Sequence, residues 1–485
     1  MRICLVATFP PSGRQLNEYA FHIARELHRH PEVELFILAD ELTEYEFATD
    51  KNGTPLKVTE QSELPGFNII RCWKFGTLST PVRLLNTIRK LKPDVVWYNL
   101  VFSSFGTPDK PFAAFAGLSA PALTRAAGFY THITLHHILE HVDFGAAGVR
   151  ADRMMRIGTE LATRALLRAH SVSVLLPGYR RTLITKYSAQ NVLLGTHGTF
   201  ASIPNPPDFT RRNNPDQRIL AIGHWGTYKR LETLMEAFPL VLERVPNARL
   251  IVGGANHHTR AGYWESIRDA QPSHLPIEFR GYIPEDDIPD LFQSTSALVL
   301  PYDSATGSSG PAHQACEYGV PIVCADIPDF RGMVADEDMA VRFYKRGDPR
   351  DLADQLVAIL QSPALQRQMA HHNFAAGVEM TMTNVVNNYL RWFELNRAKR
   401  EIRDAGVFRE RRRLWLRSLR RRNASPGWNL HPGLFAPRSV PGNGFEPPPE
   451  YAQLEACPDP FTWIGPPSSK DGFSVENGSS ARSQV

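Results

Sequence analysis

Short apolar runs of strand length alternate with helical stretches from residue 3 to residue 396, which restricts the chain to α/β architectures. The runs are rich in β-branched and aromatic residues, as parallel strands covered by helices on both faces are. In the first half they are 3–7, 33–39, 94–100, 131–137, 171–177 and 191–197. In the second half they are 218–224, 248–254, 277–282, 296–302 and 321–326. The alternation therefore predicts doubly wound parallel sheets.

The spacing of apolar residues between the runs predicts the covering helices. The clearest apolar stripe, at intervals of three and four, consists of Leu16, Tyr19, Ala20, Ile23, Ala24 and Leu27. We expect this helix to begin near Arg14, and further helices at 350–360 and 383–396.

A stretch rich in Pro and Asn interrupts the alternation and separates two domains. We expect Rossmann-like domains at 1–205 and 218–380, joined by a linker at 206–217. Because ligands of such sheets bind beyond the carboxyl ends of the strands, the two domains are expected to face one cleft. A closing helix at 381–396 is expected to pack back on the first domain.

Two segments beyond these domains differ in composition. Residues 397–422 hold twelve Lys or Arg and three Asp or Glu, a net charge of +9, so the rest of the chain carries −5. This segment could be a solvated helix, a nucleic-acid patch, or an amphipathic helix at 400–422 that contacts anionic lipid. The apolar anchors of such a helix would be Phe408, Leu414, Trp415, Leu416 and Leu419. Residues 423–485 contain eleven Pro and seven Gly and are predicted to be disordered.

Composition excludes several classes of protein. Hydrophobic residues make up 42% and charged residues 21%, as in globular proteins with a sizeable core. No apolar run approaches the ~18 residues of a membrane span, and the N-terminus reads as a buried strand rather than a signal peptide. The five cysteines contain no CxxC pair, so neither a disulfide framework nor a zinc site is supported. We expect a cytoplasmic protein.

Four histidines near the middle of the first domain suggest a metal site: His132, His136, His137 and His141. A zincin motif requires a Glu directly after the first histidine of its pair, and Ile138 occupies that position. We therefore predict no metal site.

Four motifs follow one another in the second half. They are AIGHWGTYKRLETLMEAF (221–238), ARLIVGGA (248–255), FRGYIPEDDIPDLFQSTSALVLPY (279–302) and GSSGPAHQACEYGVPIVCADI (307–327). Their order and spacing resemble the C-terminal half of the group 1 (family 4) glycosyltransferases, which are retaining enzymes of the GT-B fold. The first half of the chain resembles the same family more loosely, through the motifs PPSG, KPDVV and TLH. The resemblance implies a donor site on the second domain, an acceptor site on the first and no cofactor.

A leaving diphosphate must be stabilised by cationic side chains, backbone N–H groups and helix N-termini. Lys229 lies just past a strand end, where its long arm can reach phosphate, although a solvated lysine is the plainer interpretation. Gly307, Ser308, Ser309 and Gly310 precede a helix and allow close approach of a ligand. They would form the cradle for the donor's sugar and phosphates, or simply a capped helix start.

The sequence departs from the family pattern at three donor positions. His224 occupies the position where the family usually has an Arg. Thr306 and Gln314 occupy the positions of two Glu residues that lie near the donor sugar and the ribose. Gln314 can still hydrogen-bond ribose hydroxyls. Glu317 lies about one turn further along the helix, and we do not assign it to the ribose.

Other site residues also come from the resemblance. Gly13 lies in the loop that would pass beside the diphosphate, and Arg14 would either contact an anion or be an exposed helix-start residue. His136 matches the family's strand-end histidine near the donor sugar, with a structural histidine as an equal alternative. Tyr282 and Ile283 follow a strand end where backbone atoms would contact the nucleotide base.

These observations predict a retaining, metal-independent hexosyltransferase that uses a nucleotide diphosphate sugar. Its acceptor would be a sugar or a lipid-linked molecule in polysaccharide or glycolipid assembly, with peripheral membrane contact through 400–422 as one option and no nucleic-acid partner. The leaving phosphate would assist deprotonation of the acceptor, because no pair of carboxylates of the glycosidase kind is evident. A non-catalytic nucleotide-sugar-binding subunit is the main alternative, and a nucleotide-sugar epimerase of the same fold is another.

Overall fold

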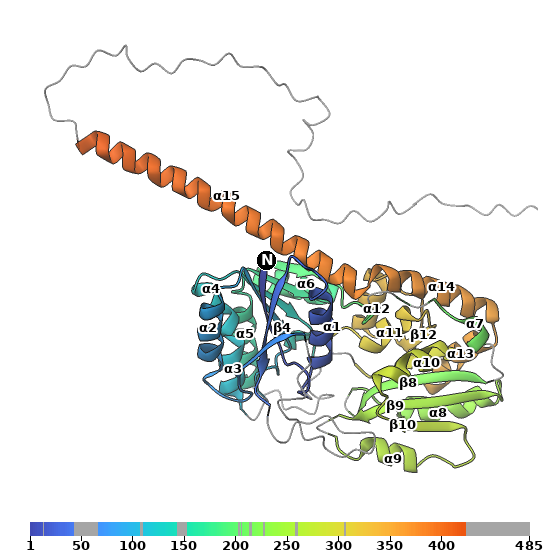
Figure 1. Ribbon diagram of the computed structural model, residues 1–485. Coiled ribbons are helices and arrows are strands. Elements are labelled where there is room, and N and C mark those ends of the chain that lie inside the picture. Colours follow the sequence, from blue (N-terminus) through green and yellow to red (C-terminus); the bar gives the residue numbers. More distant parts are fainter. Residues whose placement is uncertain are drawn as a thin grey trace, which may run out of the picture. The chain divides into compact units, whose positions relative to one another are not determined.

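The structure is a computed structural model, and it describes the chain except at 13, 43–65, 107–109, 143–152, 202–203, 205, 213–215, 227, 258–259, 305–306 and 423–485 (Figure 1). The chain divides into two units, residues 1–406 and 407–485. The first unit holds two parallel sheets with helices on both faces, which confirms the predicted fold class. The tail predicted to be disordered lies outside the described residues.

The first sheet has seven strands in the order β3-β2-β1-β4-β5-β6-β7, and all its pairs are parallel. Its strands are β1 (Arg2–Val6), β2 (Glu34–Asp40), β3 (Asn68–Trp73), β4 (Val95–Leu100), β5 (Thr131–Leu135), β6 (Ser171–Val174) and β7 (Val192–Leu194). The strand order reverses between β1 and β4. In doubly wound sheets ligands bind at this switch point.

Helices cover both faces of this sheet. They are α1 (Asn17–Leu27), α2 (Thr80–Leu91), α3 (Pro111–Leu118), α4 (Ala120–Ala126), η2 (Leu139–His141), α5 (Arg153–Leu166) and α6 (Pro177–Tyr187). On β1, Ile3 and Leu5 pack with the buried residues of α1, whereas Cys4 and Val6 belong to the core under α2, α4 and α5. The α1 helix begins at Asn17 rather than near Arg14, because Leu16 adopts a left-handed conformation with φ +72°.

The second sheet has six strands in the order β10-β9-β8-β11-β12-β13, again all parallel. Its strands are β8 (Gln217–Trp225), β9 (Ala248–Asn256), β10 (Ile277–Gly281), β11 (Ala297–Leu300), β12 (Ile322–Ala325) and β13 (Val341–Tyr344). The helices are α7 (Phe209–Arg212), α8 (Glu232–Leu242), α9 (Tyr263–Asp269), η3 (Glu285–Asp287), α10 (Ile288–Gln293), α11 (Gly310–Glu317), α12 (Pro328–Asp336), α13 (Pro349–Leu360) and α14 (Pro363–Glu379).

The expected linker at 206–217 contains a short helix, α7, and β8 begins at its last residue. Arg212 is buried and donates to the backbone carbonyls of Tyr318 and Gly319, both at 2.6 Å. These two charge-assisted bonds attach the end of α7 to the second domain.

The expected closing helix and the basic segment form one helix, α15 (Met382–Arg422). Its first turns lie in the core of the first domain, where Phe393 and Tyr389 contact Trp97 at ring-centroid distances of 5.4 and 4.6 Å. The chain thus returns to the first domain after completing the second. Among the described helices, none combines the length and the apolar character that a membrane span requires.

Candidate functional site

The end of β5 and the loop before α11 meet although they belong to different domains. His136, directly after β5, is 7% exposed, and its Nε2 lies 2.7 Å from Asn99 Oδ1. Gly307 has φ +99°, and a Cβ there would lie 2.5 Å from the His136 carbonyl oxygen. Only a glycine fits this approach. The structure thus brings together two residues that the sequence singled out separately.

His136 is an uncharged imidazole. Burial, with a smaller contribution from the neighbouring His137, lowers the pKa of His136 to about 3. Because Nε2 donates its hydrogen to Asn99, Nδ1 is left as the acceptor nitrogen. A neutral histidine in this state can accept a hydrogen bond from a sugar hydroxyl.

Tyr179 of α6 holds the Gly307 loop in place, and sequence reasoning missed it. Its hydroxyl accepts the Gly307 N–H at 2.7 Å and donates to Asp329 Oδ2 of α12 at 3.0 Å. Tyr179 is fully buried, and burial together with the Asp329 carboxylate raises the pKa of its phenol well above the ordinary value. The sequence contains no local signal for this residue, because its partners are 128 and 150 positions away.

Two buried hydroxyls lie at the start of α11 without a partner among the described residues. Ser309 occupies the N-cap position, but its side chain makes no capping bond. The Oγ atoms of Ser308 and Ser309 are both buried and unpaired in this part of the structure. An unsatisfied buried hydroxyl costs about 1–3 kcal/mol. Ligand oxygens at this helix N-terminus would satisfy both hydroxyls.

Lys229 lies beside the end of β11. It forms an antiparallel bridge with Tyr302, and its Nζ lies 5.0 Å from the centre of the Tyr302 ring. Gly223 of β8 lies alongside, since a Cβ there would be 3.8 Å from Nζ. Burial raises the pKa of the Tyr302 phenol, and the nearby ammonium group opposes this rise. The lysine charge is therefore held over the carboxyl ends of β8 and β11.

The other described donor residues occupy the same end of the second sheet or α11. His224 is exposed at the end of β8, in register with Ala255. Tyr282 is 71% exposed, whereas Ile283 packs against Gly253. Gln314 is half-buried on α11. Two further candidates, Gly13 and Thr306, lie outside the described residues, and Gly310 begins α11.

Glu317, which we did not assign to the ribose, has a structural contact. It is 5% exposed, and its Oε2 accepts a hydrogen bond from the Ala201 backbone at 3.1 Å. Burial raises the pKa of this carboxyl, while the backbone contacts oppose the rise. Glu317 thus joins α11 to the segment that leaves the first domain.

A buried pair of side chains, His313 and Glu337, fixes α11 in place. The sequence did not predict this pair. His313 Nδ1 lies 2.7 Å from the Ser309 carbonyl and Nε2 lies 3.0 Å from Glu337 Oε2. Both ring nitrogens therefore face acceptors, which favours the imidazolium form. Burial opposes that charge, but Glu337 outweighs burial and raises the pKa of His313. The sequence contains no local signal for this pair, because the two residues are 24 positions apart.

Three of the four histidines that suggested a metal site bond to separate partners. His132 Nδ1 lies 2.7 Å from Ser171 Oγ, and His136 bonds to Asn99. His141 bonds to Thr182 at 2.8 Å and lies 3.5 Å from Asp329. In the described part of the chain, no three His, Cys, Asp or Glu side chains are grouped as metal ligands would be.

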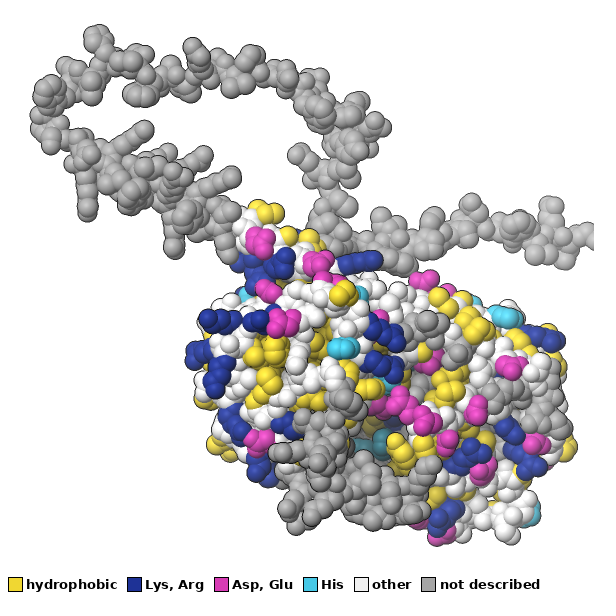
Figure 2. Space-filling view, viewed as in Figure 1, with side chains coloured by type: hydrophobic (Ala, Val, Ile, Leu, Met, Phe, Trp, Pro, Cys, Tyr) yellow, Lys and Arg dark blue, Asp and Glu magenta, His cyan; other side chains and the backbone are white. Residues whose placement is uncertain are grey.

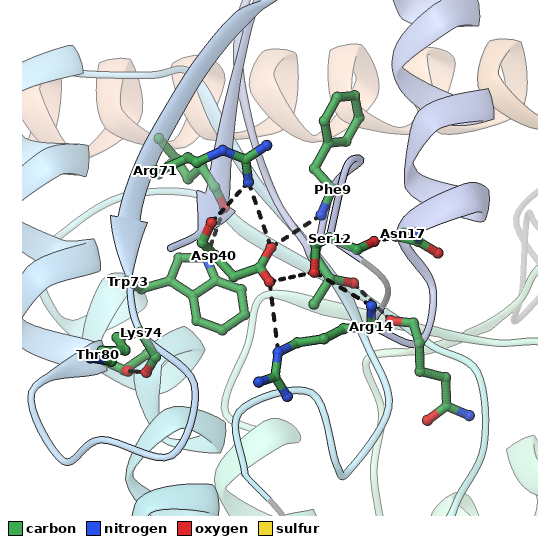
Figure 3. A network of polar contacts seen from close by, with 12 residues as sticks. Phe9, Ser12, Arg14, Asn17, Asp40, Arg71, Trp73, Lys74 and Thr80 are labelled. Atoms are coloured by element: carbon green, nitrogen blue, oxygen red, sulfur yellow. Dashed lines mark hydrogen bonds and ion pairs between the residues drawn. The ribbon is translucent and has the colours of Figure 1, made fainter. Parts of the chain in front are cut away.

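A buried carboxylate organises the loop after β1 (Figure 3). Asp40, at the end of β2, accepts from Ser12 Oγ at 2.7 Å and from the Phe9 N–H at 3.2 Å. Arg71 Nη1 lies 4.0 Å from the Asp40 carboxylate and donates to the Asp40 backbone carbonyl at 2.9 Å. Burial raises the pKa of Asp40, and these donors oppose the rise.

Arg14 belongs to the same network and is not the exposed helix-start residue that the sequence suggested. Its Nε lies 3.8 Å from Asp40 Oδ2 (Figure 3). Its guanidinium lies 3.4 Å from the centre of the Phe75 ring. Burial lowers the pKa of Arg14, and the Asp40 carboxylate opposes this. The loop before α1 is therefore anchored by a half-buried cation.

Comparison with known sequences gives matches in the second domain. Residues 216–362 match the family model described as glycosyl transferases group 1. A segment of 144 residues, 30% of this chain, is 26% identical to 36% of the O-antigen chain mannosyltransferase B of Escherichia coli. A segment of 88 residues, 17% of this chain, is 31% identical to 19% of mannosylfructose-phosphate synthase of Agrobacterium fabrum. The matched segments thus span about a third and a fifth of these relatives.

Solved structures match over both domains. Sucrose-phosphate synthase from Thermosynechococcus elongatus superposes with a TM-score of 0.61 at 16% identity, covering 82% of this chain and 100% of that chain. Anabaena HepE in complex with UDP superposes with a TM-score of 0.59 at 14% identity, covering 81% and 100%. The chain therefore has the GT-B fold, and its residues 216–362 form a glycosyl transferases group 1 domain.

Proposed function

We propose that this protein is a glycosyltransferase that moves a hexose from a nucleotide diphosphate sugar to a sugar or lipid-linked acceptor, with retention of configuration and without a metal ion. The observation that carries the proposal is the start of α11. There Gly307 touches His136, and Ser308 and Ser309 present buried hydroxyls that lack partners among the described residues. A donor sugar with its phosphates would satisfy these groups.

The leaving diphosphate would be stabilised by positive charge on two sides. Lys229 supplies a full charge, and the N-terminus of α11 supplies backbone N–H groups and the positive end of its dipole. Groups placed in advance where charge develops are the largest single contribution to many enzymatic rates. Gln314, further along α11, would donate to and accept from the ribose hydroxyls.

The transfer would occur on one face of the sugar. The acceptor oxygen forms a bond to the anomeric carbon as the bond from that carbon to the phosphate oxygen breaks. The acceptor proton passes to the departing phosphate oxygen, so no protein carboxylate is required as a base. His136 would hold the donor sugar through its acceptor nitrogen.

The comparisons suggest which donors to test first. HepE has been crystallised with UDP and with UDP-glucose, and the curated relatives include a mannosyltransferase. The name of that relative also agrees with a role in polysaccharide or glycolipid assembly. We propose a UDP- or GDP-hexose as the donor and a cytoplasmic site of action.

A non-catalytic nucleotide-sugar-binding subunit is the second candidate. The neutral residues Thr306 and Gln314 favour it, because the family has carboxylates at both positions. The test measures nucleotide binding and nucleotide release for the purified chain with UDP-, GDP- and ADP-sugars and a panel of acceptors. Acceptor-dependent release of the nucleotide supports the enzyme. Binding of a donor without release under any acceptor supports the subunit, and absence of binding contradicts both.

A further inference from the structure

One face of the first domain holds most of the large apolar side chains that are exposed in the described part of the chain. Twelve large hydrophobic side chains are exposed among the described residues, and seven of them lie on or directly before α2, α3, α4 and α5. These seven are Leu78, Val82, Phe112, Phe115, Leu123, Ile157 and Leu161. We call the surface that they form the α2–α5 face. Soluble monomers rarely expose apolar patches of this kind without a binding role.

The four helices are neighbours, so the exposed side chains belong to one surface. The α3 helix contacts α2, α4 and α5, and α4 also contacts α2 and α5. These helices cover the opposite side of the sheet from α1 and the first turns of α15. Figure 2 shows apolar side chains gathered over this part of the molecule, with Lys and Arg at its margin. The α2–α5 face therefore lies on the other side of the first sheet from the first turns of α15.

The α3 helix has no polar side chain at all. Its sequence is PFAAFAGL, and Phe112 and Phe115 on it are 82% and 41% exposed. Because only Ala113, Gly117 and Leu118 are buried, the outer half of this helix presents apolar surface. The exposed side chains of this helix would therefore gain free energy if a partner removed them from water.

The same helices are strongly basic. They carry seven Lys or Arg and a single acidic residue, Glu160, which is paired with Arg164 at 3.2 Å. On α5, Ile157 and Leu161 are exposed one turn apart, with exposed Arg153 and Arg156 beside them. Apolar residues flanked by arginines are typical of helices that lie at the surface of an anionic membrane.

We propose that the α2–α5 face docks on an anionic lipid surface. The Phe and Ile/Leu side chains of α3 and α5 enter the headgroup region, and the flanking arginines contact lipid phosphates. The positive charge of the face favours an anionic lipid surface over a second copy of the chain. Two copies paired through this face would bring their basic helices together, and like charges repel. Outside 397–422 the chain carries a net charge of −5, so this basic face is a local feature and not a property of the whole protein.

The test measures flotation of the full chain with phosphatidylcholine vesicles that contain or lack about 30% phosphatidylglycerol. We expect binding to the anionic vesicles that weakens as salt rises. Phe112→Ser/Phe115→Ser should lower the partition coefficient at least about tenfold, and Arg153→Glu/Arg156→Glu should weaken binding to the anionic vesicles and reduce its salt dependence. Val378→Ser, at a 42% exposed residue on α14, serves as the matched control and should bind as the wild type does.

Several results would overturn the proposal. One is absence of wild-type binding to anionic vesicles. Another is equal binding by the Phe112→Ser/Phe115→Ser variant and the control, which would assign membrane contact to residues 397–422. A third is loss of a wild-type dimer in the same variant with vesicle binding unchanged, which would assign the face to a second copy. Equal unfolding temperatures of variant and control would show that the fold is retained.

Discussion

Tyr179 donates a hydrogen bond from its phenol to Asp329 Oδ2 at 3.0 Å, and this bond joins a helix of the first domain to a helix of the second. The same oxygen accepts the Gly307 N–H at 2.7 Å. A single buried hydroxyl therefore links the loop before α11 to α6 and α12. If the loop before α11 binds the donor as proposed, donor binding and domain contact are coupled through this atom.

Tyr179→Phe should raise the KM for the donor and lower the free energy of unfolding. The ring remains packed, but the Asp329 carboxylate and the Gly307 N–H lose their partner, at a cost of about 1–3 kcal/mol. Steady-state kinetics and urea unfolding measure the two effects. Tyr187→Phe is the control, because Tyr187 lies on the same helix but bonds to Glu140 within the first domain. An unchanged donor KM in Tyr179→Phe would show that the bond serves stability alone.

Lys229→Ala should slow transfer about 100- to 1000-fold while leaving the fold intact. The loss of a positioned charge beside the leaving diphosphate should cost about 2.7–4 kcal/mol of transition-state stabilisation, by analogy with oxyanion-hole donors. Nucleotide release measures this loss. Arg230→Ala is the control, because Arg230 is a neighbouring exposed cation paired with Glu232 at 2.8 Å. Turnover at the wild-type rate in Lys229→Ala would remove Lys229 from the site.

Gln314→Ala should weaken donor binding by about 1–3 kcal/mol, because ribose hydroxyls would be left unpaired. Gln314→Glu should preserve or strengthen binding, since a carboxylate accepts hydrogen bonds more strongly than an amide. Calorimetry with the best donor compares both variants with the wild type. Three indistinguishable affinities would exclude a ribose role for Gln314 and favour the non-catalytic subunit.

The His313–Glu337 pair should make stability depend on pH. Because the pKa of His313 is raised above its ordinary value of 6.5, its contribution is fully present below pH 6.5 and is lost as pH rises through the raised value. The difference in unfolding free energy between the wild type and His313→Gln should therefore shrink as pH increases. Urea unfolding across this range measures it, and a difference that is constant with pH would mean that His313 is not charged in the folded state.

Sequence periodicity predicted most of the fold, because buried strands and covering helices leave local patterns. It missed β3 and β13, which are two of the four edge strands of the described sheets, and it found the other two, β7 and β10. In β3 only Cys72 and Trp73 are buried, and in β13 only Tyr344 is. Edge strands contact fewer neighbours, so their sequences need not be continuously apolar. This is why Asn68 and Arg71 can stand within β3.

The candidate site, like the fold, could be predicted only in part from the sequence. The motif pattern indicated Lys229, His136 and the Gly307–Gly310 loop, because each lies at a strand end or helix start that the sequence reveals locally. Only the tertiary structure decided that Gly307 touches His136, that Tyr179 joins the two domains, and that His313 is paired with Glu337. The physical reason is separation along the chain. Hydrogen bonds and ion pairs between residues 24 to 150 positions apart leave no periodic signal, and neither does the close approach of Gly307 to His136. These contacts form only after the two sheets have folded and come together.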